Sequence, residues 1–248
     1  MSLENLYYVG VIMKCYCYET DSMFTFCVDD VENIQLENVI QHMAWKKTDG
    51  RFLMSFTQNA FSNQREKELI SDNFSRFGQA MFESSLSGFD WKKPLEMIAQ
   101  KLNENGIEWY IVGSVGDALR GVDVRPFDMD LVIHTRDYYK VKDICYRDFS
   151  DSVIAPFTNN EEVCPLKYFG RLFLAGAMID VAADEIWNLE SRQKGFGGFT
   201  SPVSGYEKAS WNGYDVYLEN LQLRHQIEIA RNRVDRIKAF EKYINRSE

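Results

Sequence analysis

The sequence lacks an uninterrupted apolar stretch long enough to cross a bilayer, and its N-terminus lacks the basic and then apolar layout of a secretion signal. The first absence disfavours a membrane protein and the second disfavours an exported one. The five cysteines are odd in number and have no clustered spacing, which is typical of reduced intracellular thiols rather than of a disulfide framework. We therefore expect a cytoplasmic protein that has no membrane partner.

Positive charge is also in short supply. The 248 residues carry 28 Lys and Arg against 37 Asp and Glu, a formal net charge of −9 at pH 7. Such a surface would repel a phosphate backbone over most of its area, which disfavours a protein whose main task is to coat nucleic acid but still permits a local basic groove. The hydrophobic share of 45% is ample for a folded core.

Aromatic and β-branched residues dominate the first third of the chain. Residues 7–18 and 23–28 read as strands, and the pair Asp49-Gly50 predicts a second hairpin. A helix follows, because apolar residues recur at helical spacing. These residues are Leu69, Ile70, Phe74, Phe77 and Met81. We therefore predict a β-rich N-terminal unit with its following helix over residues 1–86 and a second domain over residues 87–248.

A glycine-serine turn stands near the middle of the chain. Gly113-Ser114 follows the apolar residues 109–112, and residues 115–121 read as a short helix closed by glycine. A buried strand that passes into a helix leaves backbone N–H groups unpaired at the turn. Phosphate oxygens are suitable partners for those groups.

Two aspartates, Asp128 and Asp130, follow this turn after an interval of thirteen residues. They open the apolar run of residues 131–133, and since strand side chains alternate, both carboxylates project to the same face. Adjacent carboxylates repel one another unless a cation joins them. The pair therefore indicates a divalent metal ion.

A third aspartate, Asp180, lies inside the apolar segment 177–183. An unpaired carboxylate there would carry a heavy desolvation penalty, so a compensating group is required. A magnesium ion shared with Asp128 and Asp130 would serve. The expected result is a three-carboxylate site built from neighbouring strands.

The spacing from the glycine-serine turn to the aspartate pair, together with the later Met178-Ile179-Asp180-Val181, resembles the DNA polymerase beta-type nucleotidyltransferase superfamily. Within it, the chain is most similar to the small bacterial group that includes lincosamide and aminoglycoside nucleotidyltransferases and the minimal nucleotidyltransferases of toxin–antitoxin pairs. The resemblance covers about residues 90 to 240. It implies an α+β fold with a mixed sheet backed by helices, here preceded by the β-rich N-terminal unit.

The resemblance also implies a two-metal transfer reaction. Gly113 and Ser114 would contact the β- and γ-phosphates, and Asp128 and Asp130 would ligate Mg²⁺ or Mn²⁺. Asp180 would complete the shell of the second ion and could take the proton of the acceptor hydroxyl. The hydroxyl oxygen would then attack the α-phosphorus of a nucleoside triphosphate such as ATP, and pyrophosphate would leave.

Arginines elsewhere are candidates for binding phosphate, because guanidinium matches its oxygens in pairs. Arg120 and Arg125 lie between the turn and the aspartates, and Arg125 is favoured because Pro126 fixes the chain beside it. One long closing helix is expected after a hairpin at residues 212–213. Its Arg233 and Arg236 form either a patch facing the triphosphate or a solvated helix face.

The glycines around position 197 form either a lid over the acceptor or an ordinary connecting loop. The expected activity is metal-dependent transfer of a nucleoside monophosphate to a hydroxyl-bearing acceptor. The acidic surface slightly favours a small molecule, and among nucleic acids only tRNA stays a candidate. Two alternatives are open: a catalytically inactive binding or regulatory module of antitoxin-like character, and a metal-dependent hydrolase that uses the same carboxylates.

Overall fold

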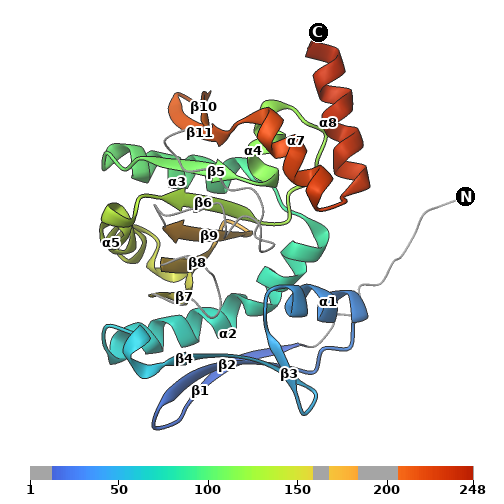
Figure 1. Cartoon of the computed structure of the whole chain (residues 1–248). Helices are drawn as coiled ribbons and strands as arrows, with labels where there is room; N and C mark the ends of the chain where they lie inside the picture. Colours follow the sequence, from blue (N-terminus) through green and yellow to red (C-terminus); the bar gives the residue numbers. More distant parts are fainter. Residues whose placement is uncertain (1–12, 159–167, 184–205, 248) are drawn as a thin grey trace, which may run out of the picture.

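Two β-sheets lie on opposite sides of one long helix, α2 (Gln64–Ser87), in the computed structural model, which describes residues 13–158, 168–183 and 206–247 (Figure 1). α2 contacts β1 (Lys14–Glu19) of the first sheet and β7 (Val153–Thr158) of the second. The predicted α+β class, with a mixed sheet preceded by a β-rich N-terminal unit, is confirmed. None of the helices in the described ranges combines the length and the apolar character that a membrane span requires.

The first sheet is antiparallel, with strand order β1-β2-β4-β3. The remaining strands are β2 (Met23–Asp29), β3 (Lys46–Thr48) and β4 (Arg51–Thr57). The predicted hairpin at Asp49-Gly50 is confirmed, because it joins β3 to β4 with positive φ at both residues.

A helix that the sequence did not predict, α1 (Ile34–His42), separates β2 from β3. The Asn33 side chain caps it by accepting hydrogen bonds from the backbone N–H groups of Gln35 and Leu36. Leu36 and Ile40 are its buried residues. The sequence pattern did not reveal this helix, because two buried apolar residues four apart are a weak periodic signal in a short helix.

Aromatic packing joins α2 to the first sheet. Phe74 of α2 stacks on Trp45 at a centroid distance of 5.7 Å and meets Phe26 edge to face at 5.1 Å. Gly78 allows α2 to lie close to β1, because a Cβ atom at this position would lie only 2.7 Å from Sγ of Cys15. One buried apolar cluster contains residues from both sides of position 86, so the division into two units stays a prediction.

The second sheet has seven strands in the order β10-β11-β5-β6-β9-β8-β7. Its remaining strands are β5 (Trp109–Val112), β6 (Met129–Ile133), β8 (Tyr168–Leu174), β9 (Ala177–Ala183), β10 (Tyr206–Trp211) and β11 (Tyr214–Glu219). β6 runs parallel to β9 and antiparallel to β5, so the sheet is mixed. This arrangement places the strand of the aspartate pair directly beside the strand of Asp180.

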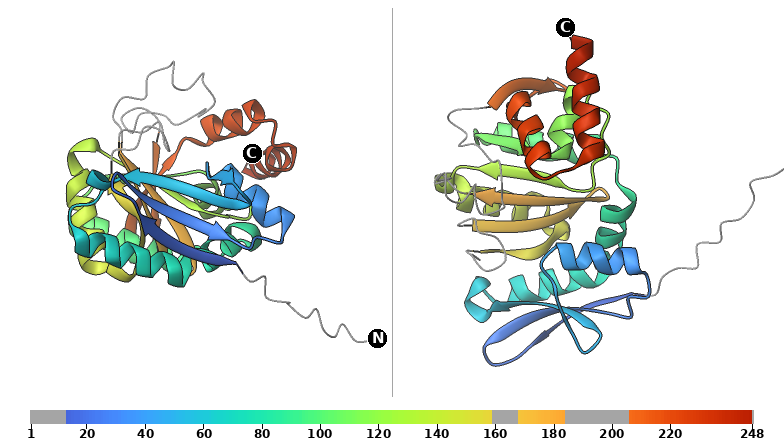
Figure 2. Two further views of the ribbon diagram at one scale, coloured as in Figure 1. Left: turned by 90° about the horizontal axis from the view of Figure 1, so that it is seen from below. Right: turned by 45° about the vertical axis from the view of Figure 1, so that its right-hand side comes forward.

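Helices flank this sheet. They are α3 (Lys92–Glu104), α4 (Ser114–Arg120), α5 (Tyr138–Asp148), α7 (Leu221–Ala230) and α8 (Val234–Ser247), with short 3-10 turns at Gln58–Ala60, Thr135–Asp137 and Ser150–Ser152. The prediction of one long closing helix was wrong, because Asn232 has a φ of 52° and ends the helical path. Val234, at the start of α8, is 51% exposed. Figure 2 shows these last two helices at the end of the molecule opposite the first sheet.

Candidate functional site

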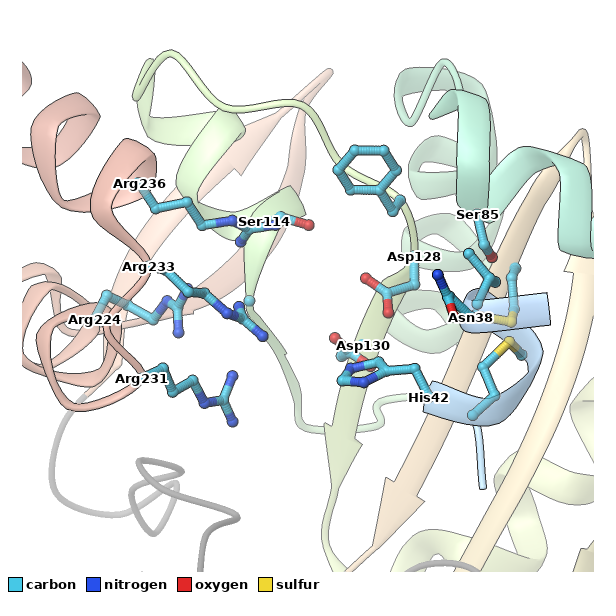
Figure 3. A pocket seen from close by; sticks show the side chains of 15 residues that line it. Asn38, His42, Ser85, Ser114, Asp128, Asp130, Arg224, Arg231, Arg233 and Arg236 are labelled. Atoms are coloured by element: carbon cyan, nitrogen blue, oxygen red, sulfur yellow. The ribbon is translucent and has the colours of Figure 1, made fainter. Parts of the chain in front are cut away.

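A cavity of about 1060 Å³, here called the central cavity, opens between two groups of elements (Figure 3). On one side lie Ser114 at the start of α4 and arginines from α7, α8 and the turn between them. On the other side lie Asp128 and Asp130 and, beyond them, the helix α1. Four of the six sequence-predicted site residues line it: Gly113, Ser114, Asp128 and Asp130.

The glycine-serine turn leads from β5 into α4 as predicted. Gly113 has φ 75° and ψ −151°, a combination open essentially to glycine alone, and a Cβ atom there would lie 3.1 Å from Oδ2 of Asp130. The Oγ atom of Ser114 is buried and has no hydrogen-bond partner among the described residues. A buried hydroxyl without a partner is costly, and a bound ligand oxygen would satisfy it.

Asp128 and Asp130 form the acidic part of the central cavity. Burial raises the pKa of both carboxyls, and the negative charge of neighbouring carboxylates raises each pKa further. No described residue forms a hydrogen bond or an ion pair with either side chain. Two acidic groups in this situation fit a divalent cation, whose charge would offset their repulsion.

Asp180 lies beside Asp130, its register partner across β6 and β9. Its carboxylate is held by Arg171 on β8, whose Nε donates to Oδ1 at 2.6 Å and whose Nη2 donates to Oδ2 at 2.9 Å. The compensation that we expected from a metal ion is therefore supplied by an arginine. Within the described ranges, no three His, Cys, Asp or Glu side chains converge closely enough to hold a metal ion. The role of Asp180 as a third ligand stays a prediction.

A buried ion cluster fixes the arginine side of the central cavity. Arg224 of α7 donates to both carboxylate oxygens of Asp117 on α4, at 3.1 and 2.7 Å, and to Glu228 at 2.7 Å. Asp117 and Glu228 are fully buried, so their pairing with Arg224 joins α7 firmly to the helix that carries Ser114. Sequence reasoning missed this cluster, because Asp117 lies 107 residues before its partner Arg224 in the chain.

Three further arginines, Arg231, Arg233 and Arg236, point into the same cavity (Figure 3). Arg233 and Arg236 share the carboxylate of Glu228 at 3.6 and 4.0 Å. Arg231 forms no ion pair with a described residue, and burial together with the positive charge of Arg233 lowers its pKa. Crowded cations of this kind favour an anionic ligand. Our sequence reading missed Arg231 and left the other two undecided.

Arg120 and Arg125 lie elsewhere. Arg120 pairs with Glu207 at 3.2 Å and donates to the backbone carbonyl of Glu219, so it supports the β10–β11 edge. Arg125 lies against Gly88 and lines a neighbouring cavity of about 440 Å³, which shares Arg233 and Arg236 with the central cavity. A role for Arg125 in nucleotide binding stays a prediction. The glycines around position 197 lie outside the described residues.

No protein-family model matches the chain, and no curated protein matches it significantly. Among solved structures, it is similar to a presumed nucleotidyltransferase from Thermotoga maritima, with 21% identity over 62% of this chain and 92% of that one and a TM-score of 0.41. It is also similar to the lincosamide antibiotic adenylyltransferase LnuA bound to lincomycin, with 12% identity over 62% and 98% of the two chains and a TM-score of 0.44. The antibiotic-resistance factor ANT(2'')-Ia shares 12% identity over 60% and 80%, with a TM-score of 0.41. These proteins belong to the class that the motifs resemble.

Proposed function

We propose that the protein transfers a nucleoside monophosphate from a nucleoside triphosphate to a hydroxyl-bearing acceptor in a metal-dependent reaction. One observation carries the proposal: a single cavity places a buried serine hydroxyl without a described hydrogen-bond partner and a group of arginines opposite two half-buried aspartates whose carboxyl pKa values are raised. The serine and the arginines suit a polyphosphate, and the two aspartates suit the metal ion that accompanies it.

Asp128 and Asp130 are the residues that would hold Mg²⁺ or Mn²⁺. A bound divalent cation would neutralise charge on the phosphoryl oxygens and make the acceptor hydroxyl more acidic. Burial and the repulsion between carboxylates raise the pKa of each carboxyl, and the positive charge of a bound cation would favour the ionised form of both.

Ser114 and the arginines would bind the triphosphate. The Ser114 hydroxyl is free to donate to a phosphate oxygen, and Arg231 is free of carboxylate partners within the described part of the chain. Glu228 holds Arg233 and Arg236 loosely, at 3.6 and 4.0 Å, which leaves guanidinium donors available. Positive charge held in place before the reaction stabilises the negative charge that develops during phosphoryl transfer.

Asp180 is the third acidic residue of the proposal. While Arg171 holds both of its oxygens, it adds negative charge beside Asp130 without offering a free ligand atom. It would serve as a metal ligand or a proton acceptor only after Arg171 releases it.

The test is a transfer assay with α-³²P-labelled triphosphates, Mg²⁺ and a panel of hydroxyl compounds, with pyrophosphate release as the second readout. We expect both signals from the wild-type protein. Asp128→Asn and Asp130→Asn should reduce them by at least about a thousandfold, because each removes a proposed metal ligand. Asp21→Asn, a matched change at an exposed residue of the first hairpin, should leave them intact.

The ion pair of Arg171 with Asp180 favours a second candidate, a nucleotide-binding module without transferase activity. Calorimetric titration with ATP and Mg²⁺ separates the two proposals. Triphosphate binding without transfer to any acceptor would support the module. Release of nucleoside monophosphate without an acceptor would identify a hydrolase instead.

A further inference from the structure

The helix α1 forms a wall of the central cavity on the side away from the arginines. Asn38, His42 and Met43 from this helix and its C-terminal end line the cavity together with Met178 of β9. Figure 3 shows Asp128 and Asp130 between the α1 residues Asn38 and His42 and the side that carries Ser114 and the arginines. If the triphosphate lies against the arginines, the space beside α1 is where the second substrate would meet the metal site.

The α1 wall differs from the arginine side in charge. Every arginine that lines the cavity comes from residues 224–236, and α1 contributes no Lys, Arg, Asp or Glu to the lining within the described ranges. Asn38 and His42 are exposed and line the cavity, where they offer hydrogen-bonding groups. Met43 and Met178 offer adaptable apolar surface.

The absence of charged side chains from the described α1 part of the lining favours some classes of acceptor over others. A phosphate group beside α1 would meet no Lys or Arg side chain on that wall within the described ranges. An uncharged hydroxyl compound needs no such partner, and an apolar face on it would pack on the methionine side chains. The charge pattern therefore disfavours nucleotides and RNA ends as acceptors.

We infer that α1 of the N-terminal unit builds the acceptor subsite and that this subsite takes an uncharged, hydroxyl-bearing compound with an apolar face. The inference rests on the proposed function, because the subsite is defined relative to the bound triphosphate. It also gives the N-terminal unit a role in the reaction: this unit selects the acceptor, while the second sheet and the C-terminal helices hold the nucleotide and the metal ion.

The test uses NMR of the full chain labelled with ¹³C-methyl methionine, in the presence of Mg²⁺ and a non-hydrolysable ATP analogue. The probes are butyl glucoside and its 6-phosphate, which differ in the charged phosphate group at position 6. We expect butyl glucoside to shift the methyl signals of Met43 and Met178 and to leave Met54, buried in the first sheet, unchanged. The 6-phosphate should shift none of them. Equal or larger shifts with the 6-phosphate, or no shift of Met43 and Met178 with either probe, would overturn the inference.

A charge placed on α1 sharpens the test. Asn38→Lys should change the ratio of the two affinities at least about tenfold in favour of the 6-phosphate, because it supplies the missing cation. Gln41→Lys is the matched control, since it adds the same charge to the same helix at an exposed residue outside the cavity lining. If both variants change the ratio equally, the effect is general electrostatics and the α1 wall is not the subsite.

Nucleotide binding is measured separately, by ³¹P NMR of the analogue without any acceptor probe. If the analogue does not bind the wild-type protein, the proposed function fails. If the analogue binds while the probes leave Met43 and Met178 unshifted, the proposed function stands and only the acceptor subsite is refuted.

Discussion

Arg171 and Asp180 face each other across β8 and β9, and two hydrogen bonds of 2.6 and 2.9 Å join the guanidinium to both carboxylate oxygens. The pair changes the charge balance at the site. Asp180 has a counterion at hydrogen-bond distance, whereas the arginines act on Asp128 and Asp130 only from farther away and form no ion pair with them within the described residues. The demand for a cation therefore comes from two carboxylates rather than from three.

Replacing Arg171 should be costly. Arg171→Met leaves the largely buried carboxylate of Asp180 without its partner, and we expect a loss of about 3 kcal/mol in the free energy of unfolding. Urea denaturation at neutral pH measures this loss. Arg147→Met is the control, because Arg147 pairs with Asp148 on the surface, where solvent screens the pair, and its loss should change stability little. Equal losses in the two variants would contradict the importance of the buried pair.

Glu219 should make stability depend on pH. Burial, and secondarily the negative charge of Asp117, raise the pKa of Glu219 from 4.5 to about 7 against the opposing effect of Arg224. The folded state therefore binds a proton more tightly than the unfolded chain. The stabilisation that proton binding to Glu219 gives the folded state is complete below pH 4.5 and is lost as the pH rises through about 7.

The corresponding variant is Glu219→Gln, which removes the titration. Between pH 4.5 and 7.5 the free energy of unfolding of the wild type should fall relative to this variant by up to about 3 kcal/mol. Urea denaturation across that range provides the measurement, with Glu104→Gln at an exposed position as the control. A constant difference across the range would show that Glu219 titrates normally.

Arg231 should contribute to triphosphate affinity. Arg231→Gln removes a cavity-lining guanidinium that has no carboxylate partner in the described ranges, so we expect at least about a tenfold weaker Kd for ATP with Mg²⁺. Affinity for AMP should change much less, because the β- and γ-phosphates are absent. Arg246→Gln, at an exposed position near the end of α8, should leave both affinities unchanged. Calorimetric titration of both nucleotides distinguishes these results.

Gly113 should tolerate no side chain. Gly113→Ala forces a β-carbon into a backbone region that other residues avoid and places it 3.1 Å from Oδ2 of Asp130. We expect a loss of at least about 1 kcal/mol in stability together with loss of nucleotide binding. Gly50→Ala is the comparison, because Gly50 also has positive φ but open space around it. If both variants bind ATP like the wild type, the close packing of the turn against Asp130 has no role in binding.

The sequence predicted the elements whose signals are local. The turn at Gly113-Ser114, the strand carrying Asp130 and the hairpin at residues 212–213 are all found where they were expected. Each depends on neighbouring residues alone: an apolar run that ends at a glycine, alternation along a strand, or an Asn-Gly pair.

The missed features depend on long-range contacts. Nothing near Asp180 identifies Arg171 as its partner, because strand pairing alone brings the two together. The placement of α1 beside the carboxylates likewise follows from how α2 packs between the two sheets. The break between α7 and α8 had a local sign in Asn232, but an asparagine within an otherwise helical pattern is a weak signal.

The pairing of Asp117 with Arg224 affects the stage of translation at which the protein can first bind nucleotide. Asp117 is synthesised 107 residues before Arg224. A growing chain therefore carries Asp117 without this counterion until α7 emerges from the ribosome. A chain that stops at Asn220 should bind no triphosphate, which nucleotide titration of that truncated form would show. Partly made molecules that lack α7 would then be unable to consume nucleotide.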